Sequence, residues 1–97
     1  MWIGWIEFDI LLGDVHSLKE KRSVVRPLLA ELKRRFEVSV AEVGNHDQYR
    51  RTQLGAGLVA ADRGHLVEVL AAVEHFVAGR PEIELLSARQ REIHSED

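Results

Sequence analysis

The chain has 97 residues, with 13 lysines and arginines against 16 aspartates and glutamates, and it contains no cysteine. A composition that is 45% hydrophobic and 30% charged is typical of a folded globular protein, and the length predicts one domain with a modest core. The net charge of −3 argues against a surface that is basic everywhere, and the lack of cysteine excludes disulfides and thiolate metal sites and favours the reducing cytoplasm.

The first predicted element is a strand over residues 2–12, because apolar side chains alternate along it. One side of this alternation carries Trp2, Ile6, Phe8, Ile10 and Leu12. We expect that even-numbered side to face the core. Glu7 and Asp9 interrupt the apolar run, which is also too short to span a bilayer, so it predicts neither a signal peptide nor a membrane anchor.

A helix is predicted over residues 18–36. Ser17 and Glu20 have the spacing of a capping box, in which the serine accepts a hydrogen bond from the third residue of the helix. The apolar residues that recur on one helical face are Leu18, Val25, Leu28, Leu29, Leu32 and Phe36. This stripe predicts that the helix packs one face against a sheet.

The second half of the chain predicts two more strands, a helix and a last strand. The strands cover residues 38–44 and 53–61, and a hairpin loop over 45–52 joins them. Asp62 is predicted to cap the second helix, and a fourth strand covers residues 82–93.

The order of these elements, β-α-β-β-α-β, predicts a ferredoxin-like α/β fold. Right-handed crossovers then give a four-stranded antiparallel sheet of order 4-1-3-2, with both helices on one face and the other face open. The first two strands run in the same direction, so their carboxyl ends share one edge. We therefore expect the loop 13–17, the start of the first helix and the hairpin 45–52 to meet at one end of the molecule.

Three stretches of the sequence resemble a known family. They are "HSLKEKRSVVRPLL", "VSVAEVGNHDQYRRTQLG" and "VAAD", and the chain is similar over about residues 3–76 to the YlxP-like family of small uncharacterised bacterial cytoplasmic proteins. The resemblance implies the ferredoxin-like fold and a setting near transcription and translation factors, and it implies no established catalytic residue or cofactor. Tyr49 stands where the family often has tryptophan.

Basic residues of the first helix and of the hairpin predict an anion-binding corner. At 100° per residue the helix places several of its cations in one sector beside the apolar stripe, and the helix N-terminus adds unpaired N–H groups. Lys21 lies nearer the core side, from which it could reach past the sheet edge. The residues predicted to bind phosphate of RNA or of a nucleotide are Lys19, Lys21, Arg22, Arg26, Tyr49, Arg50 and Arg51.

A plainer interpretation of these cations is also open. Glu20 and Glu31 could balance them locally, and the basic residues would then form only a solvated helix face.

The open sheet face predicts a protein interface. Its apolar residues are Ile3, Trp5, Leu11 and Val59. RNA-recognition motifs stack bases on aromatic side chains of this face, but the third strand here offers glycines instead, and Glu7 and Asp9 would repel phosphate. We therefore favour homodimerisation over base stacking as the role of Trp5.

Catalysis and metal binding are weakly indicated. Glu42, His46 and Asp47 are close in sequence, and His16 could approach them across the sheet end, but no H-x-H or H-E-x-x-H spacing occurs. Residues at a strand end and in a turn point in diverging directions, and Asp47 is expected to bond the backbone of the turn. No cofactor, metal or catalytic residue is predicted.

Three functional hypotheses follow. The preferred one is a non-catalytic cytoplasmic module that binds RNA or a ribosomal particle through the basic residues. The second is a homo-oligomeric adaptor or regulatory module that uses the open face around Trp5. The third is an enzyme acting on a small phosphorylated or carboxylated compound in the same corner.

Overall fold

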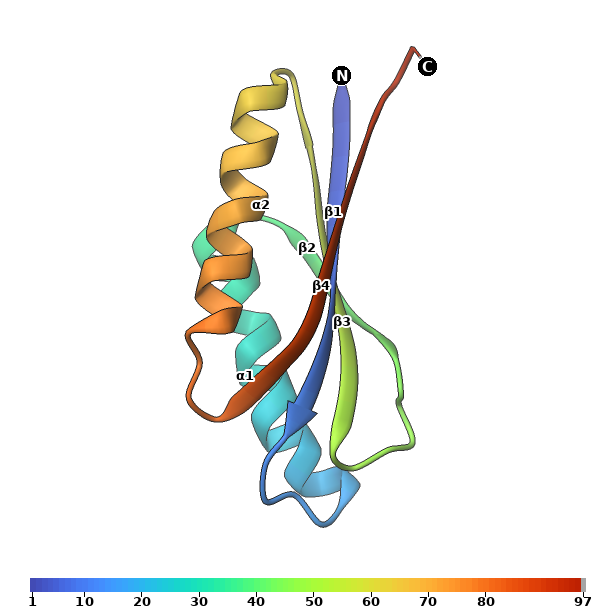
Figure 1. The fold of residues 1–97 in the computed structure, drawn as a ribbon, viewed down its shortest axis with the longest axis vertical. Coiled ribbons are helices and arrows are strands. Elements are labelled where there is room, and N and C mark those ends of the chain that lie inside the picture. The colour runs from blue at the N-terminus through green and yellow to red at the C-terminus, as the bar shows by residue number, and fades with distance from the viewer. Residues whose placement is uncertain (97) are drawn as a thin grey trace.

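A computed structural model describes residues 1–96 and contains six helices and strands (Figure 1). In chain order these elements are β1 (Trp2–Leu12), α1 (Leu18–Phe36), β2 (Ser39–Gly44), β3 (Arg51–Ala60), α2 (Arg63–Ala78) and β4 (Ile83–His94).

The four strands form one antiparallel sheet of order β2-β3-β1-β4, which is the predicted order. Trp5 of β1 pairs with Gly57 of β3 on one side and with Arg91 of β4 on the other. Both helices lie on the same face of the sheet, and the opposite face is left uncovered (Figure 1). The predicted ferredoxin-like fold is confirmed.

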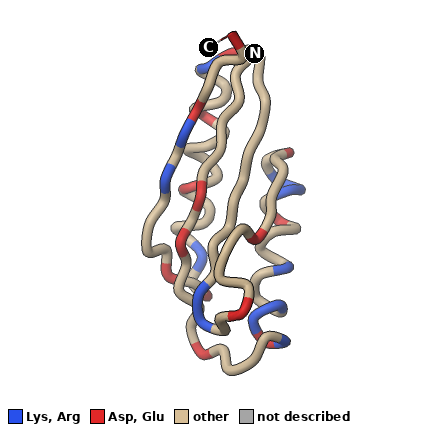
Figure 2. The backbone as a smooth tube through the Cα atoms, turned by 90° about the vertical axis from the view of Figure 1, so that its right-hand side faces the viewer, with Lys and Arg blue, Asp and Glu red and all other residues tan. Residues whose placement is uncertain are grey.

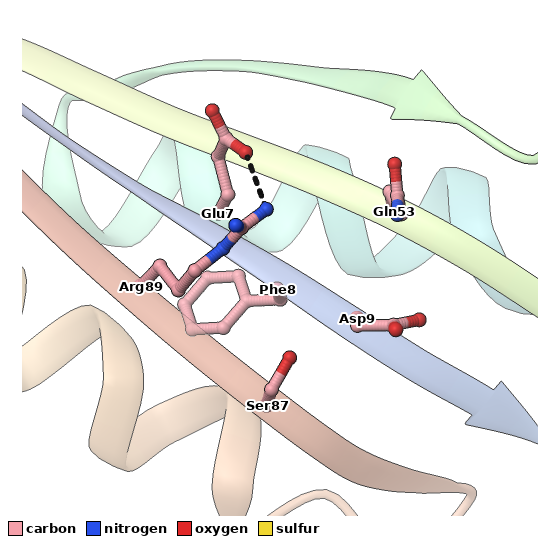
Figure 3. Close-up of a pocket in the computed structure, with 6 residues that line it drawn as sticks. All are labelled: Glu7, Phe8, Asp9, Gln53, Ser87 and Arg89. Atoms are coloured by element: carbon pink, nitrogen blue, oxygen red, sulfur yellow. Dashed lines mark ion pairs between the residues drawn. The ribbon is translucent and has the colours of Figure 1, made fainter.

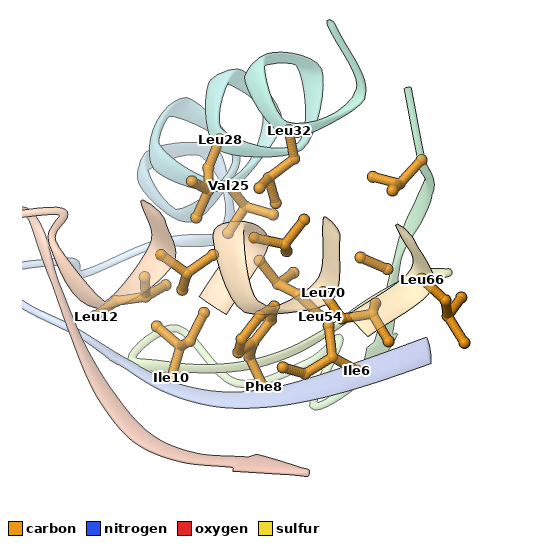
Figure 4. Close-up of a cluster of buried hydrophobic side chains, with 14 of the residues drawn as sticks. Ile6, Phe8, Ile10, Leu12, Val25, Leu28, Leu32, Leu54, Leu66 and Leu70 are labelled. Carbon is orange, nitrogen blue, oxygen red and sulfur yellow. The ribbon is translucent and has the colours of Figure 1, made fainter. Parts of the chain in front are cut away.

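The core lies between the sheet and the two helices (Figure 4). The even-numbered residues Ile6, Phe8, Ile10 and Leu12 of β1 are buried, as their alternation predicted. Leu28 and Leu32 of α1 and Leu66 and Leu70 of α2 cover them from the helix side. Burying a large aliphatic or aromatic side chain stabilises a fold by roughly 1.5–3 kcal/mol each, so this cluster fixes the sheet against the helices.

The predicted caps hold both helices at their starts. The hydroxyl of Ser17 accepts a hydrogen bond from the backbone N–H of Glu20 at 3.1 Å, and Glu20 returns one by accepting from the N–H of His16 at 3.0 Å. The carboxylate of Asp62 accepts from the N–H of Gly64 at 3.3 Å. These bonds satisfy donors that a helix start otherwise leaves unpaired.

The third strand begins earlier than the sequence predicts. Arg51 and Thr52 belong to β3 and not to the hairpin loop, because Arg51 pairs with Leu11 and Thr52 with Ile10 of β1. The polar sequence hides this start, since the two residues lack the apolar alternation that marks the rest of the strand. Among residues 1–96, no helix is long and apolar enough to cross a membrane.

Candidate functional site

The β1–α1 loop, the start of α1 and the β2–β3 hairpin meet at one end of the molecule (Figure 1). The guanidinium Nε of Arg50 donates to the carbonyl of Gly13 at 3.1 Å, and the N–H of Leu12 donates to the carbonyl of Arg50 at 2.8 Å. These bonds tie the hairpin to the end of β1. The predicted meeting of the three segments therefore occurs.

Four cations and one aromatic residue are exposed at this end, and we call this group the basic corner. It consists of Lys19, Arg22, Arg26, Tyr49 and Arg50. The basic residues of the hairpin and those in the first half of α1 lie at the same end of the backbone, and a second basic segment lies at the other end of the helix (Figure 2). Within residues 1–96, none of these four cations forms an ion pair with a carboxylate. Their charge is therefore available to an external anion.

Lys21 does not belong to this exposed group. Its side chain is only 3% exposed, and its ammonium lies 2.9 Å from a carboxylate oxygen of Glu42 and donates to the carbonyl of Asn45 at 2.6 Å. The ammonium of Lys21 therefore lies inside the chain, and not at the surface where we expected it to bind phosphate. Lys21 instead fastens the start of α1 to the end of β2 and to the first residue of the hairpin.

Glu42 is the other half of this buried contact. The hydroxyl of Thr52, which is fully buried, donates to the same oxygen of Glu42 at 2.6 Å. Burial alone would raise the pKa of the Glu42 carboxyl, but the hydrogen bonds from Thr52 and Lys21 and the charge of Lys21 outweigh it, so the pKa lies below its usual 4.5. Glu42 is therefore ionised at neutral pH and is neutralised by Lys21.

The hairpin turn is closed by its backbone. Asn45 adopts a left-handed conformation with φ 60°, which asparagine tolerates better than most residues, and its carbonyl accepts from the N–H of Gln48 at 3.2 Å. The His46 imidazole lies 3.1 Å from the carbonyl of Glu42. We expected the carboxylate of Asp47 to bond the backbone of the turn, but it forms no hydrogen bond among the described residues. The backbone carbonyl of Asn45 closes the turn instead.

A groove of about 350 Å³ separates α1 from β2 and the hairpin. α1 contributes Arg22 and Arg26 to its lining, and the hairpin contributes His46 and Asp47. The full lining is Leu18, Lys21, Arg22, Val25, Arg26, Leu29, Glu42, His46 and Asp47. The groove thus joins two of the cations of the basic corner to a surface that could hold an apolar or aromatic group.

Arg51 lies on a different surface from Arg50. Its guanidinium donates to both carboxylate oxygens of Asp9 at 2.7 and 2.8 Å, across the β1–β3 pair. Both bonds come from one nitrogen of Arg51 and balance its charge within the chain, while its buried Nε has no hydrogen-bond partner among the described residues. The earlier start of β3 explains the difference, because strand alternation turns Arg51 to the open sheet face while Arg50 stays in the loop.

Only three of the four acidic and histidine residues considered for catalysis or metal binding lie close together. Glu42, His46 and Asp47 line the same groove, whereas His16 is held by Asp14 at 2.6 Å in the β1–α1 loop. In the described part of the chain, no three histidine, aspartate or glutamate side chains are arranged to hold a metal ion. Lys21 and Thr52 both contact the same carboxylate oxygen of Glu42, so this acid has a structural role between α1, β2 and β3.

The residues predicted for the interface share the open face, with Ile3, Trp5 and Val59 near one end and Leu11 at the other. Strand pairing places Ile3 beside Val59, and Trp5 beside Gly57, on the side away from the helices. Ile3, Trp5 and Leu11 are half-buried, and Val59 is 63% exposed. This surface and the basic corner are formed by different sets of side chains.

The cluster of Lys21, Glu42 and Thr52 was missed as a unit, although the sequence contains its signal. Lys21 precedes Val25 and Leu28 by four and seven residues, which is core spacing on a helix. Glu42 alternates with Val40, and Thr52 alternates with Leu54, on the inner side of their strands. An inward lysine facing an inward glutamate predicts a buried ion pair.

Residues 3–90 match a family described as "Protein of unknown function (DUF503)". The chain is 37% identical over 82 residues to the uncharacterized protein YlxP of Bacillus subtilis (strain 168), a match that covers 84% of this chain and 89% of that protein.

Two solved structures match most of the chain. A variant of SnoaB, a cofactor-independent oxygenase from Streptomyces nogalater, matches 99% of this chain and 94% of its own with a TM-score of 0.51 and 13% identity. A protein from Shewanella oneidensis matches 95% of this chain and 90% of its own with a TM-score of 0.46 and 20% identity. At such low identity the likeness to SnoaB extends to the fold alone.

Proposed function

The chain belongs to the family of unknown function DUF503, as its resemblance to YlxP-like proteins predicted, and we propose that this member is a non-catalytic cytoplasmic module that binds RNA, free or in a ribosomal particle. The observation that carries the proposal is the basic corner. In a chain of net charge −3, it gathers four exposed cations that no carboxylate within residues 1–96 neutralises.

The spacing of the helix cations suits a phosphate backbone. Lys19, Arg22 and Arg26 follow one another at three and four residues, so they span about 10 Å along one side of α1. A nucleic-acid strand lying along this side would meet three positive charges within that distance. Neutralising phosphates in this way releases counterions and makes binding strongly dependent on salt.

Contacts within the chain fix the geometry of the basic corner in the unbound protein. Lys21 joins α1 to the hairpin, and Arg50 joins the hairpin to the β1–α1 loop. Tyr49 is 47% exposed beside them and offers a ring on which a sugar or base can pack. A surface fixed in this way loses less entropy on binding than a mobile loop would.

The test is binding of fluorescently labelled single-stranded RNA and of purified ribosomal subunits, each at low and at physiological salt. The variant Arg22→Ala/Arg26→Ala removes two cations of the corner. The matched control, Arg34→Ala/Arg35→Ala, removes the same charge from exposed positions at the far end of α1, off the side that carries Lys19, Arg22 and Arg26.

The proposal expects saturable, salt-sensitive binding that the corner variant weakens about tenfold or more and the control variant leaves nearly unchanged. Equal weakening in both variants would mean that only overall charge matters. No binding by the wild-type protein to either target would remove RNA from consideration.

A further inference from the structure

The open sheet face carries an apolar area that nothing in the chain covers. Ile3 of β1, Val59 of β3 and Ile93 of β4 lie side by side at one end of the face, because strand pairing places Ile3 opposite both others. Val59 is 63% exposed and Ile93 is 46% exposed. Exposed aliphatic side chains that adjoin one another in this way are more typical of an interface than of a solvated surface.

Next to this area the face has an apolar hollow of about 270 Å³. It exists because Gly55 and Gly57 of β3 have no side chains, while Trp5 and Val43 stand beside them. Its lining is Trp5, Glu7, Ser39, Val40, Ala41, Val43, Gly55, Ala56 and Gly57. The face therefore offers both projecting side chains and a recess that can receive them.

Two acids of the face have cations beside them. Glu7 lies 3.6 Å from Arg89 across the β1–β4 pair, and Asp9 holds Arg51 at 2.7 Å. Figure 3 shows Glu7 and Arg89 facing each other over a polar hollow of about 230 Å³ on this surface. Because Glu7 and Asp9 each have a cation beside them, these two acids add little repulsion when two copies of the face approach. The same acids disfavour a phosphate backbone here. Arg91 and Glu84 also lie on this face, opposite Trp5 and Leu11, and form no ion pair within residues 1–96.

The size of the face also suits a pair of chains. Strands of about ten residues are roughly 33 Å long, and four strands are about 19 Å wide, so the twisted face measures roughly 600 Å² when laid out in a plane. Two such faces would bury about 1,200 Å² together, above the about 1,000 Å² expected for a stable interface.

We propose that this face binds a second copy of the same chain, with the apolar end and the glycine hollow of each copy packed against the other. A twofold pairing uses one patch on both partners, so a patch must be complementary to itself. The projecting side chains of Val59 and Ile93 and the recess at Gly55 and Gly57 meet that condition. The pairing would leave the basic corner free on both chains.

The test is the molar mass of the full chain in solution, measured by light scattering after gel filtration over a range of micromolar concentrations. The wild-type protein is expected at twice its chain mass of 11.0 kDa. Val59→Asp places a charge in the apolar contact and should give the monomer mass. Val59 is exposed in the single chain, so the variant should keep its circular dichroism spectrum and fold. Tyr49→Asp, an equally drastic change at an exposed site on the hairpin, should remain a dimer.

Tryptophan fluorescence gives a second readout. In a Trp2→Phe background the emission comes from Trp5 alone, and dilution should shift it to longer wavelengths as the interface opens and the ring meets water. A wild-type mass of 11.0 kDa at every concentration would overturn the proposal. So would a Val59→Asp variant that remains a dimer with unchanged Trp5 emission, because the contact would then lie elsewhere. RNA binding by a monomeric protein would leave the proposed function intact.

Discussion

The basic corner and the open sheet face carry arginines next to each other in sequence, but they use them in opposite ways. Arg50 lies in the hairpin loop, where its guanidinium bonds a backbone carbonyl and keeps its charge unmatched. Arg51 begins β3, where it is held by both oxygens of Asp9. Location in a loop or in a strand thus decides which arginine is free for an anion and which belongs to a balanced surface.

The largest expected effect concerns the contact on which the corner depends. Lys21→Met removes the cation but leaves Glu42 largely buried and without its ion-pair partner, and a broken pair of this kind costs about 3 kcal/mol. Urea unfolding measures the loss. Lys19→Met, two residues earlier and exposed, should change stability by less than about 0.5 kcal/mol.

A double variant separates this mechanism from a simple packing defect. Lys21→Met/Glu42→Gln removes both charges and should recover part of the lost stability, because the remaining amide can still accept from Thr52. If the double variant is less stable than Lys21→Met alone, the ion pair is not the source of the effect.

The fold could be predicted from the sequence because its signals are local and repeated. Alternation in β1, the cap at Ser17 and the helical stripe through Leu28 and Leu32 each follow from neighbours in the chain, and only one common topology fits their order. The candidate site was harder, since it depends on how distant residues meet. Whether Lys21 is exposed depends on Glu42, which is 21 positions away in the sequence.

The start of β3 is the second feature that the sequence pattern does not predict. Strand prediction relies on apolar alternation, and Arg51 and Thr52 continue the strand with polar side chains that are satisfied by Asp9 and Glu42. Asp9 on β1 and Glu42 on β2 stabilise these two residues, and the sequence near Arg51 and Thr52 gives no sign of these contacts. With the strand start predicted two residues too late, Arg51 is assigned to the basic corner, although it lies on the open face. A strand boundary can thus change a functional assignment.

The second prediction compares the two adjacent arginines directly. Arg50→Ala should reduce the slope of log affinity for RNA against log salt by about one, because one phosphate contact is lost. Arg51→Ala should leave the slope nearly unchanged, since that charge is matched by Asp9. Titrations of labelled RNA at several salt concentrations measure both slopes. Equal slopes for the two variants would mean that the distinction between loop and strand has no consequence for binding.

The third prediction uses pH to test the anchor of the corner. Because the pKa of Glu42 is lower in the folded chain than its usual 4.5, the folded state binds this proton less tightly than the unfolded state does. The resulting stability is fully present above pH 4.5 and is lost as the pH falls through the folded pKa. The urea midpoint should therefore fall more steeply with acid in the wild-type protein than in Glu42→Gln. Glu68→Gln, at an exposed position of α2, should follow the wild-type curve.

The smallest expected effect concerns the acid on the groove rim. Asp47 faces the same groove as Arg22 and Arg26 and has no ion-pair partner within residues 1–96, so it should oppose an approaching phosphate. Asp47→Asn keeps the shape and should strengthen RNA binding about two- to fivefold at low salt, the range expected for exposed charges. The gain should shrink at high salt, because screening weakens the repulsion that the substitution removes. Asp9→Asn on the open face should give no such gain, and a gain there equal to that of Asp47→Asn would place the RNA on the sheet and not in the corner.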